Sequence, residues 1–133
     1  MKYFFDWLYK KGVRHIIKLS VEDSGASGQK VHSDLVIRES LSRFIIEHLD
    51  WQKTDLDPET ILHINSKGHS KEDKHAEIVP GGQLKKLTLR WSGRNAVLRA
   101  WSGPDALPLL PHLQEVEVVQ PHSLEVWIAT PLT

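Results

Sequence analysis

The chain has 133 residues, with 17 basic side chains balanced by 17 acidic ones, and it contains no cysteine. This length fits a single domain or part of a larger protein, and the zero net charge gives no long-range attraction for nucleic acid or an anionic membrane. Without cysteine, disulfides, thiol catalysis and thiolate metal sites are excluded, which fits a reducing, cytoplasmic compartment.

Residues 2–11 are predicted to form a short helix that ends at Gly12. The residues expected to face inward are Phe4, Trp7 and Leu8. Charged residues interrupt the segment, so it does not resemble the apolar core of a signal peptide. The helix is expected either to cover an open end of the core or to dock another domain, and Tyr3 and Trp7 are then candidate partner-binding residues.

Residues 13–21 alternate between apolar and polar side chains, which predicts the first strand. The side chains expected to point inward are Val13, His15, Ile17, Leu19 and Val21. After a turn-rich loop, Ser33 is expected to cap a helix over residues 34–44. The inward residues of that helix are expected to be Ile37, Leu41 and Phe44.

Three later segments share one apolar spacing and are predicted to be the remaining strands, over residues 46–56, 84–91 and 113–119. The shared residues are Ile46-x-x-Leu49-x-Trp51, Leu84-x-x-Leu87-x-Leu89 and Leu113-x-x-Val116-x-Val118. A helix capped by Asp57 follows the first of these segments, and a helix capped by Asn95 and carrying Trp101 follows the second. Residues 65–82 are polar and predict a mobile loop, and residues 124–128 are expected to form a last short strand or a tail.

Strands that alternate with helices predict an α/β domain with a four-stranded, mainly parallel sheet. Because the strands alternate, helices are expected on one face only. The shared spacing matches the first part of a leucine-rich repeat but lacks its asparagine. We therefore expect a short, irregular leucine-rich-repeat-like stack over residues 1–133, with a flavodoxin-like or ferredoxin-like sheet as the alternatives.

The face opposite the helices is predicted to carry polar side chains from all four strands. Its charged members are expected to be Arg14, Lys18, His48, Asp50, Lys86, Arg90, Glu115 and Glu117, with Ser20, Gln52 and Thr88 among them. Neighbouring strands carry opposite charges, so this face is either a solvated surface or a recognition surface for a protein partner.

Other motifs lack the spacing that chemistry requires, so no catalytic, cofactor-binding or metal-ligating residue is expected. The loop from Gly25 to Gly28 matches no phosphate-binding pattern. His63, His69 and His75 are six residues apart, with Glu72 and Asp73 nearby, and no single helix face holds that spacing. His32, Ser33 and Asp34 are the residue types of a serine triad, but adjacency in sequence is not triad geometry.

The segments GVRHIIKLSVED, DWQKTDLDPETI and LRWSGRNAVLRAWSGPDALPLLPHL resemble a region that precedes the subtilisin-like domain in large intracellular multidomain proteins of filamentous fungi. The resemblance implies a non-catalytic accessory module. The aromatic N-terminal helix and the charged sheet face favour a module that contacts a neighbouring domain or a protein partner. Two alternatives stay open: a small-ligand or nucleotide-binding domain using the Gly25–Gly28 loop, and a propeptide-like inhibitor of an adjoining protease.

Overall fold

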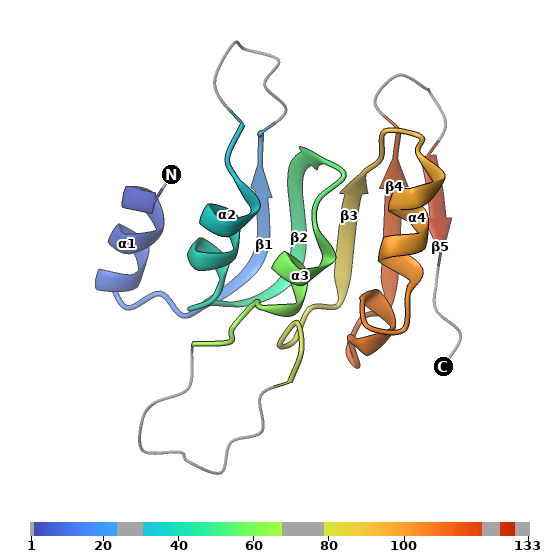
Figure 1. Ribbon diagram of the computed structural model, residues 1–133. Helices are drawn as coiled ribbons and strands as arrows, with labels where there is room; N and C mark the ends of the chain where they lie inside the picture. The colour runs from blue at the N-terminus through green and yellow to red at the C-terminus, as the bar shows by residue number, and fades with distance from the viewer. Residues whose placement is uncertain (1, 24–30, 68–78, 121–125, 130–133) are drawn as a thin grey trace.

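The computed structural model describes residues 2–23, 31–67, 79–120 and 126–129 of the chain (Figure 1). Helices alternate with the first four strands. In order, the elements are α1 (Lys2–Lys10), β1 (His15–Val21), α2 (Asp34–Leu41), β2 (Ile45–Thr54), α3 (Pro58–Leu62), β3 (Lys86–Arg90), α4 (Asn95–Ser102), the short 3-10 helix η1 (Leu107–Leu109), β4 (Glu115–Val119) and β5 (Val126–Ala129).

The strands form one sheet in the order β1-β2-β3-β4-β5, which confirms the predicted α/β class. The first four strands are parallel, and β5 is added antiparallel to β4. In Figure 1, α2, α3 and α4 lie on one face of the sheet and α1 lies beyond β1. A flavodoxin-like sheet has the order 2-1-3-4-5, and a ferredoxin-like chain runs βαββαβ, so neither alternative describes this sheet. The leucine-rich-repeat-like stack stays a prediction.

One apolar spacing directs side chains toward the helices in all four parallel strands, including β1. The four sets are Ile16-x-x-Leu19-x-Val21, Ile46-x-x-Leu49-x-Trp51, Leu84-x-x-Leu87-x-Leu89 and Leu113-x-x-Val116-x-Val118. Ile16 lies opposite Ile46 and Leu19 opposite Leu49. In both strands, two residues instead of one separate the first inward apolar residue from the second, so the in–out alternation is interrupted at the same place. The prediction of strict alternation in β1 was therefore wrong: Ile17 is 73% exposed, and His15 is exposed as well.

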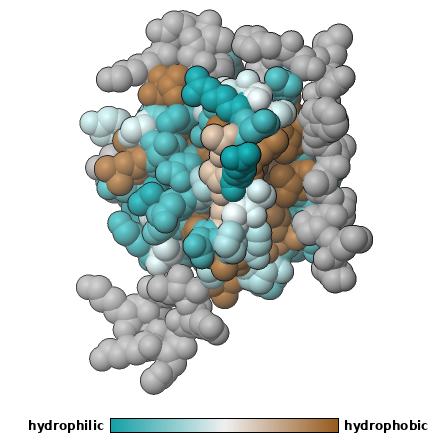
Figure 2. Space-filling view, turned by 45° about the vertical axis from the view of Figure 1, so that its right-hand side comes forward, coloured by the Kyte–Doolittle hydropathy of each residue, from teal (hydrophilic) through white to brown (hydrophobic). Residues whose placement is uncertain are grey.

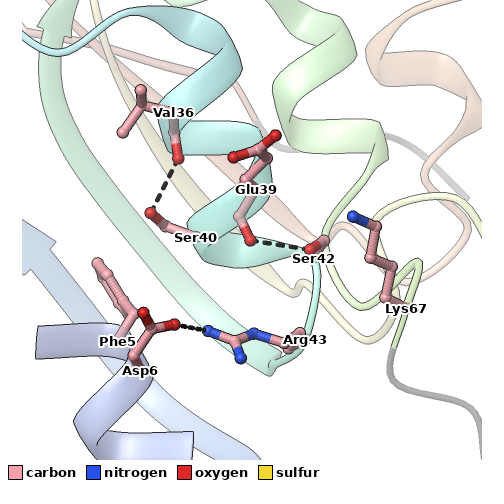
Figure 3. Close-up of a pocket in the computed structure, with 8 residues that line it drawn as sticks. All are labelled: Phe5, Asp6, Val36, Glu39, Ser40, Ser42, Arg43 and Lys67. Atoms are coloured by element: carbon pink, nitrogen blue, oxygen red, sulfur yellow. Dashed lines mark hydrogen bonds and ion pairs between the residues drawn. The ribbon is translucent and has the colours of Figure 1, made fainter. Parts of the chain in front are cut away.

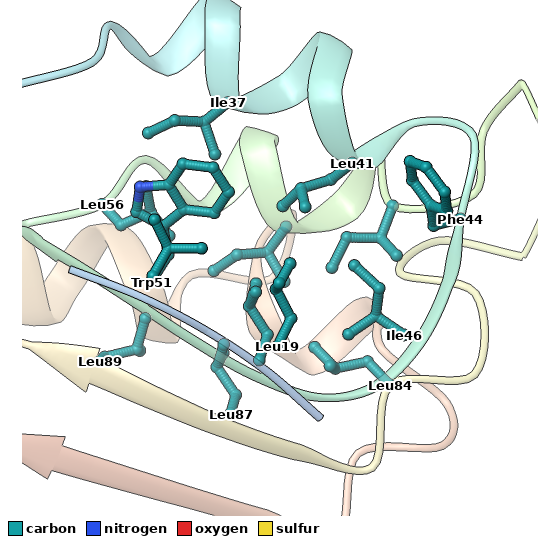
Figure 4. Close-up of a cluster of buried hydrophobic side chains, with 14 of the residues drawn as sticks. Leu19, Ile37, Leu41, Phe44, Ile46, Trp51, Leu56, Leu84, Leu87 and Leu89 are labelled. Atoms are coloured by element: carbon teal, nitrogen blue, oxygen red, sulfur yellow. The ribbon is translucent and has the colours of Figure 1, made fainter. Parts of the chain in front are cut away.

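The core lies between the sheet and α2, α3 and α4 (Figure 4). Its largest fully buried side chain is that of Trp51, which is 1% exposed and stacks on the ring of Phe5 with the centroids 6.0 Å apart. Ile37, Leu41 and Phe44 are fully buried, as predicted. Trp101 is buried too, and its indole N–H donates to the carbonyl oxygen of Leu56 at 2.8 Å, which joins α4 to the turn after β2.

The N-terminal helix α1 covers the core through a different face from the one predicted. Phe5 is fully buried, with Leu8 and Tyr9 packed beside it, whereas Phe4 and Trp7 are about half exposed. Phe5, Leu8 and Tyr9 have the same i, i+3, i+4 spacing as the predicted set, so both faces of this aromatic helix satisfy the pattern. The face predicted to be inward was wrong apart from Leu8.

The helix starts follow the predicted caps in two cases of three. The Ser33 hydroxyl accepts from the Val36 N–H at 3.3 Å, and the Asp57 carboxylate accepts from the Glu59 N–H at 3.0 Å. Asn95, in contrast, is the first residue of α4 and not its cap; Arg94 holds that position without a side-chain hydrogen bond. The helix predicted over residues 34–44 ends at Leu41, which leaves Phe44 in the connection to β2.

Two glycines with positive φ differ in the space around them. Gly12 (φ +91°) has no atom within 4 Å of an added Cβ, whereas a Cβ on Gly81 (φ +70°) would overlap the Leu110 side chain. We expect Gly12→Ala to lower the free energy of unfolding by about 1–2 kcal/mol, from backbone strain alone. Gly81→Ala is expected to lower the free energy of unfolding by about 1–3 kcal/mol more than Gly12→Ala does, because the added methyl group also overpacks against Leu110. Urea unfolding measures both, and equal losses would contradict the assigned packing of Gly81.

Candidate functional site

The sheet face away from the helices carries two rows of mostly polar side chains that run across the four parallel strands. The paired residues of the first row are Lys18, His48, Lys86 and Glu115, and those of the second are Ser20, Asp50, Thr88 and Glu117. We call these two rows, together with Arg90, the polar sheet face. Each residue lies between the inward apolar positions of its strand, so burial of the apolar set places these side chains outward.

Oppositely charged residues pair across neighbouring strands on this face. The Arg90 guanidinium donates to both carboxylate oxygens of Asp50, at 2.9 and 3.2 Å, and both side chains are mostly buried. Lys86 Nζ lies 3.7 Å from the Glu115 carboxylate. Asp50 and Arg90 therefore stabilise the sheet by a charge-assisted contact, whereas Lys86 and Glu115 form a looser pair.

At the start of the strands, the Glu47 carboxylate contacts one lysine and one histidine. Its carboxylate lies 3.0 Å from Lys85 Nζ and 2.9 Å from His15 Nε2. The hydrogen bond from Lys85 lowers the pKa of Glu47, with a smaller contribution from His15 and with burial opposing both. These three residues extend the polar surface beyond its first row.

His48 lies between two lysines in the first row. Burial lowers the pKa of His48, and the charges of Lys86 and Lys18 lower it further, against weaker opposing effects from Asp50 and Glu115. Its Nε2 atom lies 3.5 Å from the hydroxyl of Thr88, a residue that is 5% exposed. The middle of the polar sheet face therefore favours neutral histidine, with one lysine on either side of it.

Arg14 does not join the polar sheet face, so its predicted position there was wrong. Its guanidinium lies 3.6 Å from the centroid of the Tyr9 ring and donates to the Tyr9 carbonyl oxygen at 2.8 Å. Arg14 therefore ties α1 to the start of β1. The candidate residues Tyr3 and Trp7 lie on the outer surface of α1, 88% and 55% exposed.

A buried carboxylate that sequence reasoning missed lies at the end of β1. Asp23 accepts the indole N–H of Trp51 at 2.8 Å, the backbone N–H of His32 at 3.1 Å, and contacts His32 Nδ1 at 3.0 Å. Burial is the largest single effect and raises the pKa of Asp23, but the hydrogen bonds from Trp51 and His32 together lower it below its ordinary value. This cluster fixes Trp51 in the core rather than forming a reactive centre.

The other residues of the triad-like motif have separate structural roles. Ser33 caps α2, and Asp34 lies 3.2 Å from Lys53 Nζ.

His63, from the histidine series, contacts the Glu59 carbonyl oxygen at 2.8 Å. His69 and His75, their acidic neighbours Glu72 and Asp73, and the Gly25–Gly28 loop lie outside the described residues. So does most of the predicted mobile loop over 65–82. Within the described ranges, no group of three or more histidine and acidic residues could hold a metal ion.

Several hollows lie on the helix side of the molecule, including one of about 430 Å³ between the start of α3 and α4. Another, of about 360 Å³, lies between α1 and α2 over Phe5, and the ion pair of Asp6 with Arg43 crosses it (Figure 3). In Figure 2, which brings the β4 and β5 side forward, hydrophobic residues gather on the right of the described surface. A third hollow, of about 410 Å³, is lined by apolar side chains of α4, η1, β3 and β4. Neither the hollow over Phe5 nor the apolar one combines an open cavity with convergent reactive groups.

No family model, curated protein or solved structure matches this chain. None of the helices in the described ranges has the length and apolar character that crossing a membrane requires. The candidate site therefore rests on this chain's own geometry, in which the polar sheet face brings charged side chains from four strands into register.

Proposed function

We propose that this chain is a non-catalytic protein-interaction or regulatory module whose polar sheet face contacts a neighbouring domain or another protein. One observation carries the proposal: helices cover one face of the parallel sheet, and the other presents charged side chains from four strands in register. A rigid sheet holds such groups at fixed spacings, which suits recognition of a complementary protein surface.

The exposed aromatic side chains of α1 support the same proposal. Tyr3 and Trp7 are residue types that dominate binding energy at protein interfaces, and Phe4 stacks beside Trp7 with centroids 6.4 Å apart. Large exposed aromatic side chains grouped on one helix are unusual on a surface that stays in water. We propose that α1 adds apolar contact to an interaction that the polar sheet face orients.

The resemblance to regions that precede fungal subtilisin-like domains suggests such a domain as the contact, within a larger cytoplasmic protein. The absence of cysteine from the sequence supports a reducing compartment. Inhibition of such a protease by this chain added in trans would instead favour the propeptide-like alternative.

A double charge reversal tests the proposal. Lys18 is exposed and Lys86 forms only the looser pair with Glu115, so Lys18→Glu with Lys86→Glu is expected to preserve the fold. Binding to the subtilisin-like domain proposed as its neighbour, measured by calorimetry, is expected to weaken about tenfold or more, since about 1.4 kcal/mol corresponds to one decade. Arg90 is unsuitable for this purpose, because its reversal would place a second carboxylate against Asp50.

The matched control is Arg94→Glu with Arg99→Glu, which changes the net charge equally on the exposed surface of α4. This control is expected to bind as the wild type does. Unchanged binding of the sheet-face variant, or an equal loss in both variants, would contradict a role for the polar sheet face.

A further inference from the structure

The first row of the polar sheet face places a histidine between two lysines, and this arrangement points to the chemistry of the partner. Lys18, His48 and Lys86 lie side by side on β1, β2 and β3. Neighbouring strands are about 4.8 Å apart, so the two lysine backbones are separated by roughly 10 Å with the imidazole between them. Long lysine side chains can converge from both sides on a group placed above His48.

The acidic residues near this row are already paired or lie at its end. Asp50, the neighbouring outward residue on β2, accepts both hydrogen bonds from Arg90. Glu115 lies beyond Lys86 on β4, at 3.7 Å from the ammonium group. The positive charge over β1 to β3 is therefore only partly neutralised from within the described part of the chain.

We infer that the row formed by Lys18, His48 and Lys86 binds a carboxylate side chain of an acidic segment in the protein partner. This inference rests on the proposed function and names the chemistry recognised by that surface. A carboxylate over His48 would be attracted by both lysines and would accept a hydrogen bond from the imidazole. A nucleic acid fits less well, because Glu115 and Glu117 on β4 would repel a continuous phosphate backbone.

Binding of the carboxylate is linked to protonation of His48. In the free protein, burial, Lys86 and Lys18 lower the pKa of His48, while Asp50 and Glu115 oppose them weakly. A bound carboxylate opposes the lysine charges and raises the pKa of His48, so the protonated protein binds the acidic segment more tightly. Affinity consequently increases as the pH falls toward and through the pKa of His48.

The test uses the whole chain and a blocked hexa-aspartate peptide, which stays largely ionised at mildly acidic pH. Nuclear magnetic resonance of the His48 ring should show a higher midpoint of titration with the peptide than without it. A rise of about half a pKa unit corresponds to about threefold tighter binding by the protonated protein. His48→Gln should abolish this pH dependence, and Lys18→Gln with Lys86→Gln should weaken binding at every pH.

The control variant Arg94→Gln with Arg99→Gln removes the same charge from α4 and should bind the peptide as the wild type does. A peptide affinity that does not change with pH, or is equal in the two double variants, would overturn the inference. So would inorganic phosphate or anionic phospholipid vesicles producing the same effects as the peptide. None of these outcomes would contradict the proposed function, because the proposed function is tested by binding to the neighbouring domain and not by binding to the peptide.

Discussion

Replacing Trp51 with alanine is expected to lower the free energy of unfolding by about 3–5 kcal/mol, the largest effect of any single substitution considered. The side chain is 1% exposed, stacks on Phe5 and donates to Asp23 at 2.8 Å. Its loss leaves a cavity where β2, α1 and α2 meet and removes one donor from a buried carboxylate. Urea unfolding followed by circular dichroism measures the change.

Trp51→Phe keeps an aromatic ring in the core while losing the indole N–H and part of the ring volume, so it remains measurable if the alanine variant does not fold. We expect it to be intermediate in stability. Trp7→Ala is the control: the Trp7 side chain is 55% exposed, and its loss should change the free energy of unfolding by no more than about 0.5 kcal/mol. Comparable losses for Trp7 and Trp51 would contradict the orientation of α1.

Asp23→Asn is expected to lower the free energy of unfolding by about 1.5–3 kcal/mol at neutral pH, as for loss of hydrogen bonds to a charged group. The pKa of Asp23 in the folded protein lies below its ordinary value of 3.8, so the unfolded chain takes up a proton first on acidification. The stabilisation by Asp23 is therefore present above pH 3.8 and is lost as the pH falls through the lower pKa of the folded state.

The difference in stability between the wild type and Asp23→Asn should consequently narrow below pH 3.8. Unfolding in urea, repeated from neutral to acidic pH, measures this difference. Asp105→Asn changes an exposed carboxylate and should leave both the stability and its pH profile close to those of the wild type. A constant difference between the wild type and Asp23→Asn at all pH values would show that Asp23 is not stabilised as an anion.

Local patterns predicted the α/β class, the parallel strands and the caps at Ser33 and Asp57, because spacing and capping act over a few residues. The same local reasoning misplaced Ile17 and the inward face of α1. Strict alternation placed Ile17 inward, whereas the alternation is interrupted after Ile16 and Ile17 is exposed. In α1, two aromatic faces have the same spacing, so the pattern could not show which one faces the core. Only packing against neighbouring elements decides between such alternatives.

The sequence predicted which residues lie on the polar sheet face wherever alternation along a strand is enough to place them. Lys18, His48, Asp50, Lys86, Glu115 and Glu117 follow from alternation between inward apolar residues. Contacts that depend on loop paths were not foreseen: Asp23 meets His32 across the loop after β1 and Trp51 across the sheet. Arg14 was misplaced because its partner, Tyr9, lies on a helix whose orientation the sequence pattern left open.

Helices cover one face of the sheet while the charged face is open, and thiol labelling tests this arrangement directly. Because the chain has no cysteine, a single introduced thiol reports its own accessibility. Ser20→Cys, on the open face, is predicted to react nearly as fast as in the unfolded chain, whereas Leu49→Cys, beneath the helices, is predicted to be protected. A protected thiol at position 20, or equally fast labelling at both positions, would contradict the account.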